Sequence, residues 1–200
     1  MQTQTTTMSL DAYFEFEYNA TERHEYTGVA PRAFAYTSVN HGRIVANIFK
    51  KIASCIDDKN CMVYVGDRML YAEECKRVFY PDLLIVCDDE KFYNYKGKMQ
   101  ATLNPRILIE VLSDSTKDID YNEKWHCYKK ITSVEQYIIV SQDKKLVELY
   151  ERLQNNIWKI QDFEQNEDEF KIGDCAIKLS DIYKNVPIDD DDFEGESVSE

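Results

Sequence analysis

The sequence predicts one mixed α/β domain, and three observations support this. Its 200 residues fall within the roughly 100–200 residues of a typical domain. The composition, 44% hydrophobic and 30% charged, is that of an ordinary globular protein. Short apolar runs typical of buried strands alternate with stretches of helical periodicity. No internal repeat is visible.

The first quarter of the chain predicts a helix, a hairpin and a second helix. Ser9 precedes the segment DAYFEFEY and can cap a short helix there. Residues 25–36 are strand-like, and Gly28 and Pro31 indicate a hairpin within them. After Ser38, apolar residues recur at helical spacing at Ile44, Val45, Ile48, Phe49, Ile52 and Ile56.

The remainder predicts strands around one further helix. Cys61–Val65 is a short strand, and Leu83–Cys87 and Ile107–Leu112 are typical of central strands buried on both faces. A helix is expected from Asp118 to Ile131. A last set of strands comprises Tyr137–Ser141, a hairpin partner at Leu146–Arg152, the alternating segment NIWKIQDF on the outside, and CAIKL.

The net charge of −13 is concentrated at the C-terminal end. Residues 187–200 carry seven acidic and no basic residues; without them, 30 acidic and 24 basic residues leave −6. This charge argues against broad, nonspecific attraction to phosphate backbones. We predict a flexible N-terminus (1–8), a single domain (9–186) and a disordered acidic tail (187–200). The tail is interpreted as a solvated solubility segment; the alternative is a regulatory strip that masks a basic cleft.

Composition also restricts location and metal chemistry. No apolar run approaches the roughly 20 residues of a membrane span, and the polar start MQTQTTT is unlike a signal peptide, so we expect a cytoplasmic protein without membrane contact. The six cysteines lack zinc-ligand spacing and are expected to be reduced thiols, several of them buried.

Two acidic residues stand within apolar strand sequence. Asp82 begins the run in YPDLLIV, and Glu110 lies inside ILIEVLS. If these strands pair antiparallel, a register that joins Asp82 to Glu110 places both carboxylates on one face. Two buried anions need a cationic partner, and Mg²⁺ prefers oxygen ligands. The alternative is a buried ion pair between Glu110 and a nearby Lys or Arg.

A lysine on the following helix completes this group. Asp120, Lys124 and Tyr128 are spaced four residues apart and share one helix face. Lys124 can then position or deprotonate a water molecule, or stabilise charge on a phosphate. The alternative is a surface ion pair between Asp120 and Lys124. His41 and His126 can serve as bases, but they stand in no recognisable catalytic arrangement and are interpreted as structural.

These segments resemble a known family. The stretches RHEYTGVAPRAFAYTSVNHGRIVANIFKKI, VYVGDRMLY, FYPDLLIVC, PRILIEVLSDST, DYNEKWHCYKKI and EQYIIVSQD are similar to the Uma-type restriction endonuclease family, a branch of the PD-(D/E)XK nuclease-like superfamily. The resemblance covers roughly residues 9–185. It implies a restriction-endonuclease-like core with a mixed central sheet flanked by helices, and a homodimer. The hairpin at Leu146–Arg152 adds a C-terminal β-hairpin region to this core.

The resemblance also implies site residues. The acidic positions of the family fall on Asp82 and Glu110, and Glu25 in RHEY matches a glutamate that adds a metal contact. The lysine of the superfamily normally follows the second acid by two residues, where this chain has Leu112; the Uma-type lysine on the following helix matches Lys124. The polar loop of the family matches Ser113, Ser115 and Thr116, which implies that they contact the substrate. The alternative is that these residues cap the following helix.

The predicted function is therefore Mg²⁺-dependent hydrolysis of DNA phosphodiesters, with Mn²⁺ as a substitute cation. Asp82, Glu110 and Lys124 are the predicted catalytic residues, and Asp82, Glu110 and Glu25 the predicted metal ligands. The alternative is a non-catalytic binding or interaction module on a nuclease-like scaffold, favoured by the acidic charge and the scattered basic residues. A nuclease that acts on RNA or a branched substrate is a third hypothesis.

Overall fold

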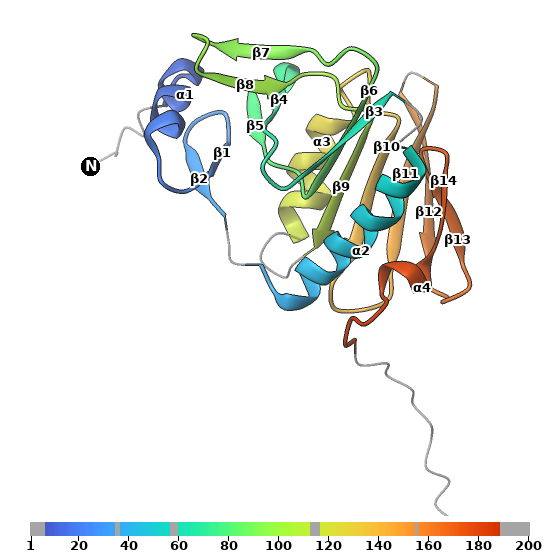
Figure 1. The fold of residues 1–200 in the computed structure, drawn as a ribbon. Coiled ribbons are helices and arrows are strands. Elements are labelled where there is room, and N and C mark those ends of the chain that lie inside the picture. Colours follow the sequence, from blue (N-terminus) through green and yellow to red (C-terminus); the bar gives the residue numbers. More distant parts are fainter. Residues whose placement is uncertain (1–6, 35–36, 57–59, 113–116, 155, 189–200) are drawn as a thin grey trace, which may run out of the picture.

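A six-stranded mixed sheet forms the centre of the protein in a computed structural model that describes residues 7–34, 37–56, 60–112, 117–154 and 156–188 (Figure 1). The strand order is β12-β11-β10-β9-β6-β3, in which β9 and β10 are parallel and every other pair is antiparallel. The strands are β3 (Cys61–Val65), β6 (Leu83–Cys87), β9 (Ile107–Leu112), β10 (Gln136–Ser141), β11 (Val147–Gln154) and β12 (Ile157–Phe163). The predicted mixed α/β class and strand segments are confirmed.

Both faces of this sheet are covered, which explains the uninterrupted apolar runs of its central strands. One face packs against α2 (Val39–Ile56), α4 (Leu179–Ile182) and the hairpin of β13 (Glu169–Ile172) and β14 (Cys175–Lys178). The other face packs against a π-helix, η2 (Ile119–Lys124), and the α-helix α3 (Trp125–Tyr128) that continues it. Figure 1 shows α2 and α3 on opposite sides of the sheet.

A second six-stranded sheet, which the sequence did not predict, lies on the α3 side. Its order is β2-β1-β5-β4-β8-β7, and α1 (Leu10–Asn19) packs against it through Tyr13 and Phe14. The strands are β1 (His24–Tyr26), β2 (Pro31–Ala33), β4 (Leu70–Ala72), β5 (Arg77–Phe79), β7 (Phe92–Tyr95) and β8 (Met99–Thr102), with a 3₁₀ turn η1 (Glu73–Cys75) between β4 and β5. The predicted hairpin is the β1–β2 pair.

The predicted N-terminal cap is present. The Ser9 hydroxyl accepts a hydrogen bond from the Ala12 amide at 3.2 Å. Replacing Ser9 with alanine should lower the free energy of unfolding by about 1 kcal/mol, because the amide then loses its acceptor. Urea denaturation measures this. Ser9→Thr keeps the hydroxyl and should behave like the wild type, and an unchanged midpoint in Ser9→Ala would show that the cap adds nothing.

The predicted helix from Asp118 to Ile131 differs from the observed one. Its first part is the π-helix η2, and α3 ends at Tyr128. A four-residue spacing of Asp120, Lys124 and Tyr128 is compatible with both helix types, so the sequence pattern does not distinguish them.

The expectation of reduced thiols is wrong for this structure. All six cysteines form disulfides: Cys55–Cys175 joins α2 to β14, Cys61–Cys87 joins β3 to β6, and Cys75–Cys127 joins η1 to α3. Cysteine spacing alone does not reveal this, because six cysteines allow 15 pairings and only the fold brings the correct ones together.

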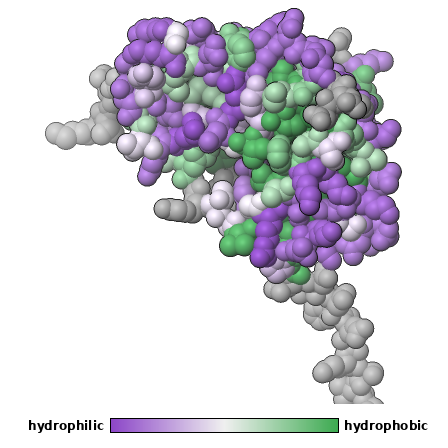
Figure 2. Space-filling view, viewed as in Figure 1, coloured by the Kyte–Doolittle hydropathy of each residue, from purple (hydrophilic) through white to green (hydrophobic). Residues whose placement is uncertain are grey.

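The surface has both polar and apolar regions. Figure 2 shows hydrophilic residues over α1 and β7 and hydrophobic residues around β3 and α2, where Met62, Val65 and Phe49 are exposed. None of the helices in the described ranges has the length and apolarity that a membrane span requires. The tail at 189–200 and residues 1–6 lie outside the described residues, so their predicted flexibility stays a prediction, as does the homodimer.

Candidate active site

Asp82 directly precedes β6, and Glu110 lies in the neighbouring strand β9. β6 and β9 are antiparallel with Leu83 opposite Ile109, and continuing this register by one residue sets Asp82 opposite Glu110. Side chains alternate between the faces of a strand, so Glu110 shares its face with Leu108 and Leu112, which pack on the α3 side. The carboxylate of Glu110 contacts Lys124 and Tyr128. That of Asp82 contacts His41 of α2 and the Val111 amide instead.

Lys124 lies among three buried carboxylates. Its Nζ is 2.9 Å from Glu110 Oε2, 2.9 Å from Asp120 Oδ1 and 3.5 Å from Glu25 Oε1. The Lys124 side chain is only 7% exposed, so these ion pairs are shielded from water. Three elements supply the carboxylates, β9, η2 and β1, and they converge because η2 packs over the sheet. The alternative of a surface pair between Asp120 and Lys124 is wrong in one respect, because the two residues do pair but are buried.

Burial and charge set the ionisation of this cluster. Burial raises the pKa of Glu110 well above its ordinary value; Lys124 opposes this shift, and Asp120 and Asp82 add to it. Burial would by itself lower the pKa of Lys124, but the carboxylates of Glu110, Glu25 and Asp120 outweigh it and raise that pKa well above its ordinary value. Lys124 is therefore charged at neutral pH.

Three further residues contact the predicted acids. The Tyr128 hydroxyl donates to Glu110 Oε1 at 2.9 Å, and both side chains are buried. Asp82 Oδ2 accepts from the Val111 amide at 2.7 Å, and Asp82 Oδ1 lies 3.0 Å from His41 Nε2. Each carboxylate therefore has a fixed orientation before any ligand binds.

Sequence reasoning missed the contact between His41 and Asp82. The available signal was the position of His41 on the apolar face of α2, three residues before Ile44 and seven before Ile48, which directs its side chain toward the protein interior. His126 is exposed on α3, away from this contact.

Glu25 is held by cations. It lies opposite Arg32 in the β1–β2 hairpin, and the Arg32 guanidinium donates to Glu25 Oε2 at 2.8 Å. Arg32 also contacts Glu123 at 3.3 Å, and Glu123 pairs with Arg77 at 2.6 Å. This chain of ion pairs runs from Lys124 through Glu25 outward to the surface. The predicted substrate contacts Ser113, Ser115 and Thr116 lie outside the described residues.

The donor set fits a hard divalent cation in its chemistry. The buried carboxylates of Glu25, Glu110 and Asp120 surround Lys124. The carboxylate of Asp82 is partly exposed and contacts His41. Carboxylate oxygens are the ligands that Mg²⁺ prefers. Among the residues that the structure describes, however, no three or more Asp, Glu, His or Cys side chains lie where they could hold a metal ion together.

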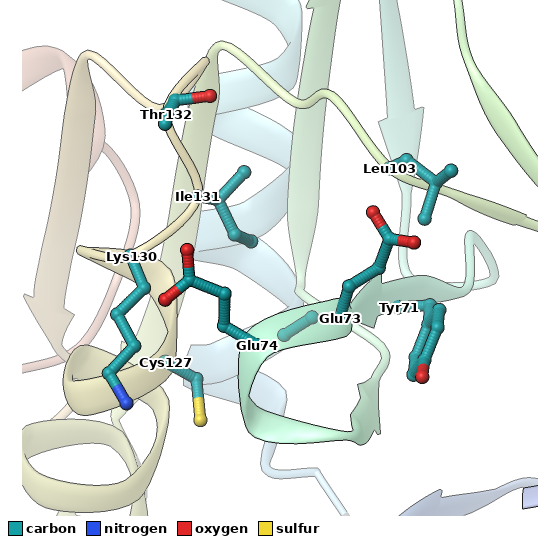
Figure 3. Close-up of a pocket in the computed structure, with 9 residues that line it drawn as sticks. Tyr71, Glu73, Glu74, Leu103, Cys127, Lys130, Ile131 and Thr132 are labelled. Atoms are coloured by element: carbon teal, nitrogen blue, oxygen red, sulfur yellow. The ribbon is translucent and has the colours of Figure 1, made fainter.

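A separate pocket lies outside this cluster. Its volume is about 130 Å³, and it is lined by Glu73 and Glu74 of η1 and by residues in and after α3, including Cys127 and Lys130 (Figure 3). It contains none of the predicted site residues. The chemistry of the carboxylate–lysine cluster is therefore not centred on this pocket.

Comparison with known proteins places the chain in a family. Residues 10–179 match the model of the Uma2 family, described as "Putative restriction endonuclease". The chain belongs to the Uma2 family. The uncharacterized Synechocystis protein sll1609 is 30% identical over 146 residues, 73% of this chain and 81% of the relative. A second Synechocystis protein, slr1290, also uncharacterized, is 23% identical over 180 residues, 90% of this chain and 93% of that protein.

The fold is also similar to that of a solved structure. A crystal structure described as a putative nuclease belonging to DUF820, from Anabaena variabilis, superposes with a TM-score of 0.69 over 88% of this chain and 97% of that chain. The sequence identity is 14%, so this likeness shows the fold alone. The predicted membership of an Uma-type family and the nuclease-like fold are both confirmed.

Proposed function

We propose that this Uma2 protein is a metal-dependent endonuclease that hydrolyses DNA phosphodiesters. The observation that carries the proposal is the juxtaposition of Asp82 and Glu110 on adjacent strands, with the ammonium group of Lys124 2.9 Å from Glu110. The family description and the nuclease-like fold support it.

In this proposal Asp82 and Glu110 hold the cation, and Glu25 lies beside them. When bound, Mg²⁺ supplies Lewis acidity and lowers the pKa of a water molecule. Tyr128 and the Val111 amide hold the two carboxylates in place. Lys124, charged and shielded from water, stabilises negative charge that develops on the phosphate.

A second candidate has its own supporting observation. Lys124 and Arg32 already pair with Glu110 and Glu25, as in a structural ion-pair network. This favours a non-catalytic binding module on the same scaffold, which would bind no divalent cation at Asp82.

Mn²⁺ titration by calorimetry separates the two candidates. A nuclease site should bind Mn²⁺, and Asp82→Asn should weaken binding by about 10–100-fold because a ligand loses its charge. Glu135→Gln is the matched control, since Glu135 forms an exposed pair with Arg106 apart from the cluster. Absence of Mn²⁺ binding to the wild type favours the binding module.

Cleavage tests the activity itself. We expect the wild-type protein to cut supercoiled and linear duplex DNA with Mg²⁺ or Mn²⁺ and to be inactive in EDTA. Parallel reactions with RNA and with branched DNA define the substrate class. A wild-type protein that is inert on every nucleic acid with both cations would contradict the proposal.

A further inference from the structure

A disulfide joins the second sheet to the helical segment that carries Lys124. Cys75 is the last residue of η1, which connects β4 to β5, and Cys127 lies in α3, three residues after Lys124. Tyr128, the residue after Cys127, donates to Glu110 in the carboxylate–lysine cluster. The bond is therefore a covalent link between the second sheet and the segment from which Lys124 and Tyr128 reach the cluster.

Two noncovalent contacts join the same two segments. Arg77 of β5 pairs with Glu123 of η2 at 2.6 Å, and about a third of each side chain is exposed. The ring of Phe79 in β5 lies 5.3 Å from that of Tyr128, edge to face, within the core. A partly exposed ion pair stabilises weakly. Breaking the disulfide therefore leaves the solvent-facing side of this connection to a weak contact.

The disulfide borders two cavities. One is the pocket of about 130 Å³ described above, and the other is a groove of about 550 Å³ whose lining includes both Cys75 and Cys127. Cys127 and Lys130 line both cavities, and Figure 3 shows them at the first. Cys75 is half-buried, whereas Cys127 is only 2% exposed. Thiol–disulfide exchange requires access to a sulfur atom, so the groove gives a reductant a route to Cys75.

A cation lies near the buried sulfur. Lys130 lines both cavities together with Cys127, and so does the carboxylate of Glu74. The neighbouring His126 shows which charge prevails, because its pKa is lowered, first by Lys130 and then by burial and two further cations. Positive charge beside a cysteine stabilises its thiolate and makes it a better leaving group.

We propose that Cys75–Cys127 is a thiol–disulfide exchange site, which a dithiol reductant opens through the groove, and that reduction loosens the η2–α3 segment beside the carboxylate–lysine cluster. Cys75 is the sulfur attacked, since it is the more exposed of the two. Cys127 is the leaving group. The inference goes beyond the proposed function, because it involves neither a metal ion nor a nucleic acid.

The reaction is a two-electron reduction of the disulfide. A thiolate of the dithiol attacks Cys75 Sγ and forms a mixed disulfide as the bond to Cys127 Sγ breaks, and the Cys127 thiolate takes up a proton. The second thiol of the reductant, once deprotonated, attacks the reductant sulfur of the mixed disulfide. This releases Cys75, which is protonated in turn, and leaves the reductant as a cyclic disulfide. Two electrons and two protons pass from the dithiol to the cysteine pair.

The other two disulfides lie in different surroundings. Cys61–Cys87 joins directly opposed residues of β3 and β6, so the strand pairing keeps its sulfur atoms together after reduction and favours closure of the bond again. Cys55–Cys175 packs against the core under α2, where Cys175 is 2% exposed. Neither pair is in the lining of the groove. We therefore expect both bonds to resist a dithiol longer than Cys75–Cys127.

The experiment follows the three disulfides of the full chain in competition. The protein is purified without reductant and exposed at neutral pH to a low concentration of dithiothreitol, a dithiol. Free thiols are blocked with N-ethylmaleimide at successive times, and mass spectrometry of the peptides identifies the labelled cysteines. The other two disulfides are the internal control, since all three bonds meet the same reductant in the same molecule.

We expect Cys75 and Cys127 to be labelled at least about 10-fold faster than the other cysteines, because access and a good leaving group both accelerate exchange. Equal rates for the three bonds or faster labelling of another pair would overturn the inference. So would labelling of Cys75 and Cys127 only after unfolding in urea, or the absence of their bond from the untreated protein.

Hydrogen exchange measures the effect on the helical segment. Cys75→Ser/Cys127→Ser lacks the bond, and the backbone amides of η2 and α3 should exchange at least about 3-fold faster than in the wild type, because local opening becomes easier. Cys61→Ser/Cys87→Ser is the matched control and should keep the wild-type rate in η2 and α3. Wild-type protein reduced at Cys75–Cys127 alone gives the same comparison if the double variant does not fold. Unchanged exchange in η2 and α3, or an equal increase in the control, would overturn the inference.

Discussion

Replacing Lys124 with methionine is expected to lower the free energy of unfolding by about 3–5 kcal/mol, because the substitution leaves Glu110, Asp120 and Glu25 buried without their shared cation. Methionine keeps most of the side-chain volume, so the loss is electrostatic rather than a cavity effect. Urea denaturation at neutral pH gives the value. Cleavage of DNA should be lost with it.

A double variant keeps this prediction testable if the single one does not fold. Lys124→Met/Glu110→Gln removes one of the orphaned charges and should recover part of the stability. Lys130→Met, at a lysine without an ion pair in the described ranges, is the control and should change stability by no more than about 0.5 kcal/mol. If Lys124→Met and the wild type had the same midpoint of urea unfolding, the carboxylates would be stable without this cation.

The pH dependence of the same variant has a defined sign. Burial raises the pKa of Glu110 above its ordinary value near 4.5, and loss of Lys124 raises it further. The native state then binds a proton more tightly than the unfolded chain, so the stability from this group is present below the ordinary pKa and is lost as the pH rises through the raised one. The deficit of Lys124→Met should therefore shrink in acid.

Loss of the Cys55–Cys175 disulfide is expected to cost about 5 kcal/mol. The bond closes a loop across 120 positions of the sequence, and a crosslink over so long a segment restricts the unfolded chain strongly. Cys55→Ala/Cys175→Ala should unfold at a clearly lower urea concentration than the oxidised wild type.

The disulfide Cys61–Cys87, which joins the neighbouring strands β3 and β6, gives the matched comparison. Cys61–Cys87 closes a loop of only 26 positions, so Cys61→Ala/Cys87→Ala should lose less stability. Thiol titration of the unfolded protein gives the number of free cysteines beforehand. Six free thiols, or equal stability of reduced and oxidised protein, would contradict the prediction.

The central sheet could be predicted because its strands are buried on both faces. Leu83–Cys87 and Ile107–Leu112 are nearly continuous apolar runs, and they pair antiparallel, as the sequence analysis assumed. The second sheet could not. Leu70–Ala72 and its partners are three or four residues long, too short for a periodic pattern, and are held by pairing with distant segments.

The spacing of the sequence indicated some neighbours in the carboxylate–lysine cluster, but not the burial of the cluster or its other contacts. The four-residue spacing of Asp120 and Lys124 indicated their pairing, yet their burial depends on how η2 packs over the sheet. The partners of Asp82 arise from tertiary structure: His41 comes from a helix 41 positions earlier in the chain.

The π-helix η2 is an irregular winding of the backbone, but it sets the position of Asp120 relative to Lys124. A π turn contains one residue more than the α turn that it replaces, and its backbone hydrogen bonds run from residue i to i+5. Removing one residue between Asp118 and Lys124 would restore ordinary α-helical winding. It would also rotate the preceding part of the segment by roughly 100° relative to Lys124, so Asp120 would swing away from the ammonium group. A natural or engineered version of this chain that is one residue shorter here would therefore have a regular α-helix and would lack the ion pair between Asp120 and Lys124.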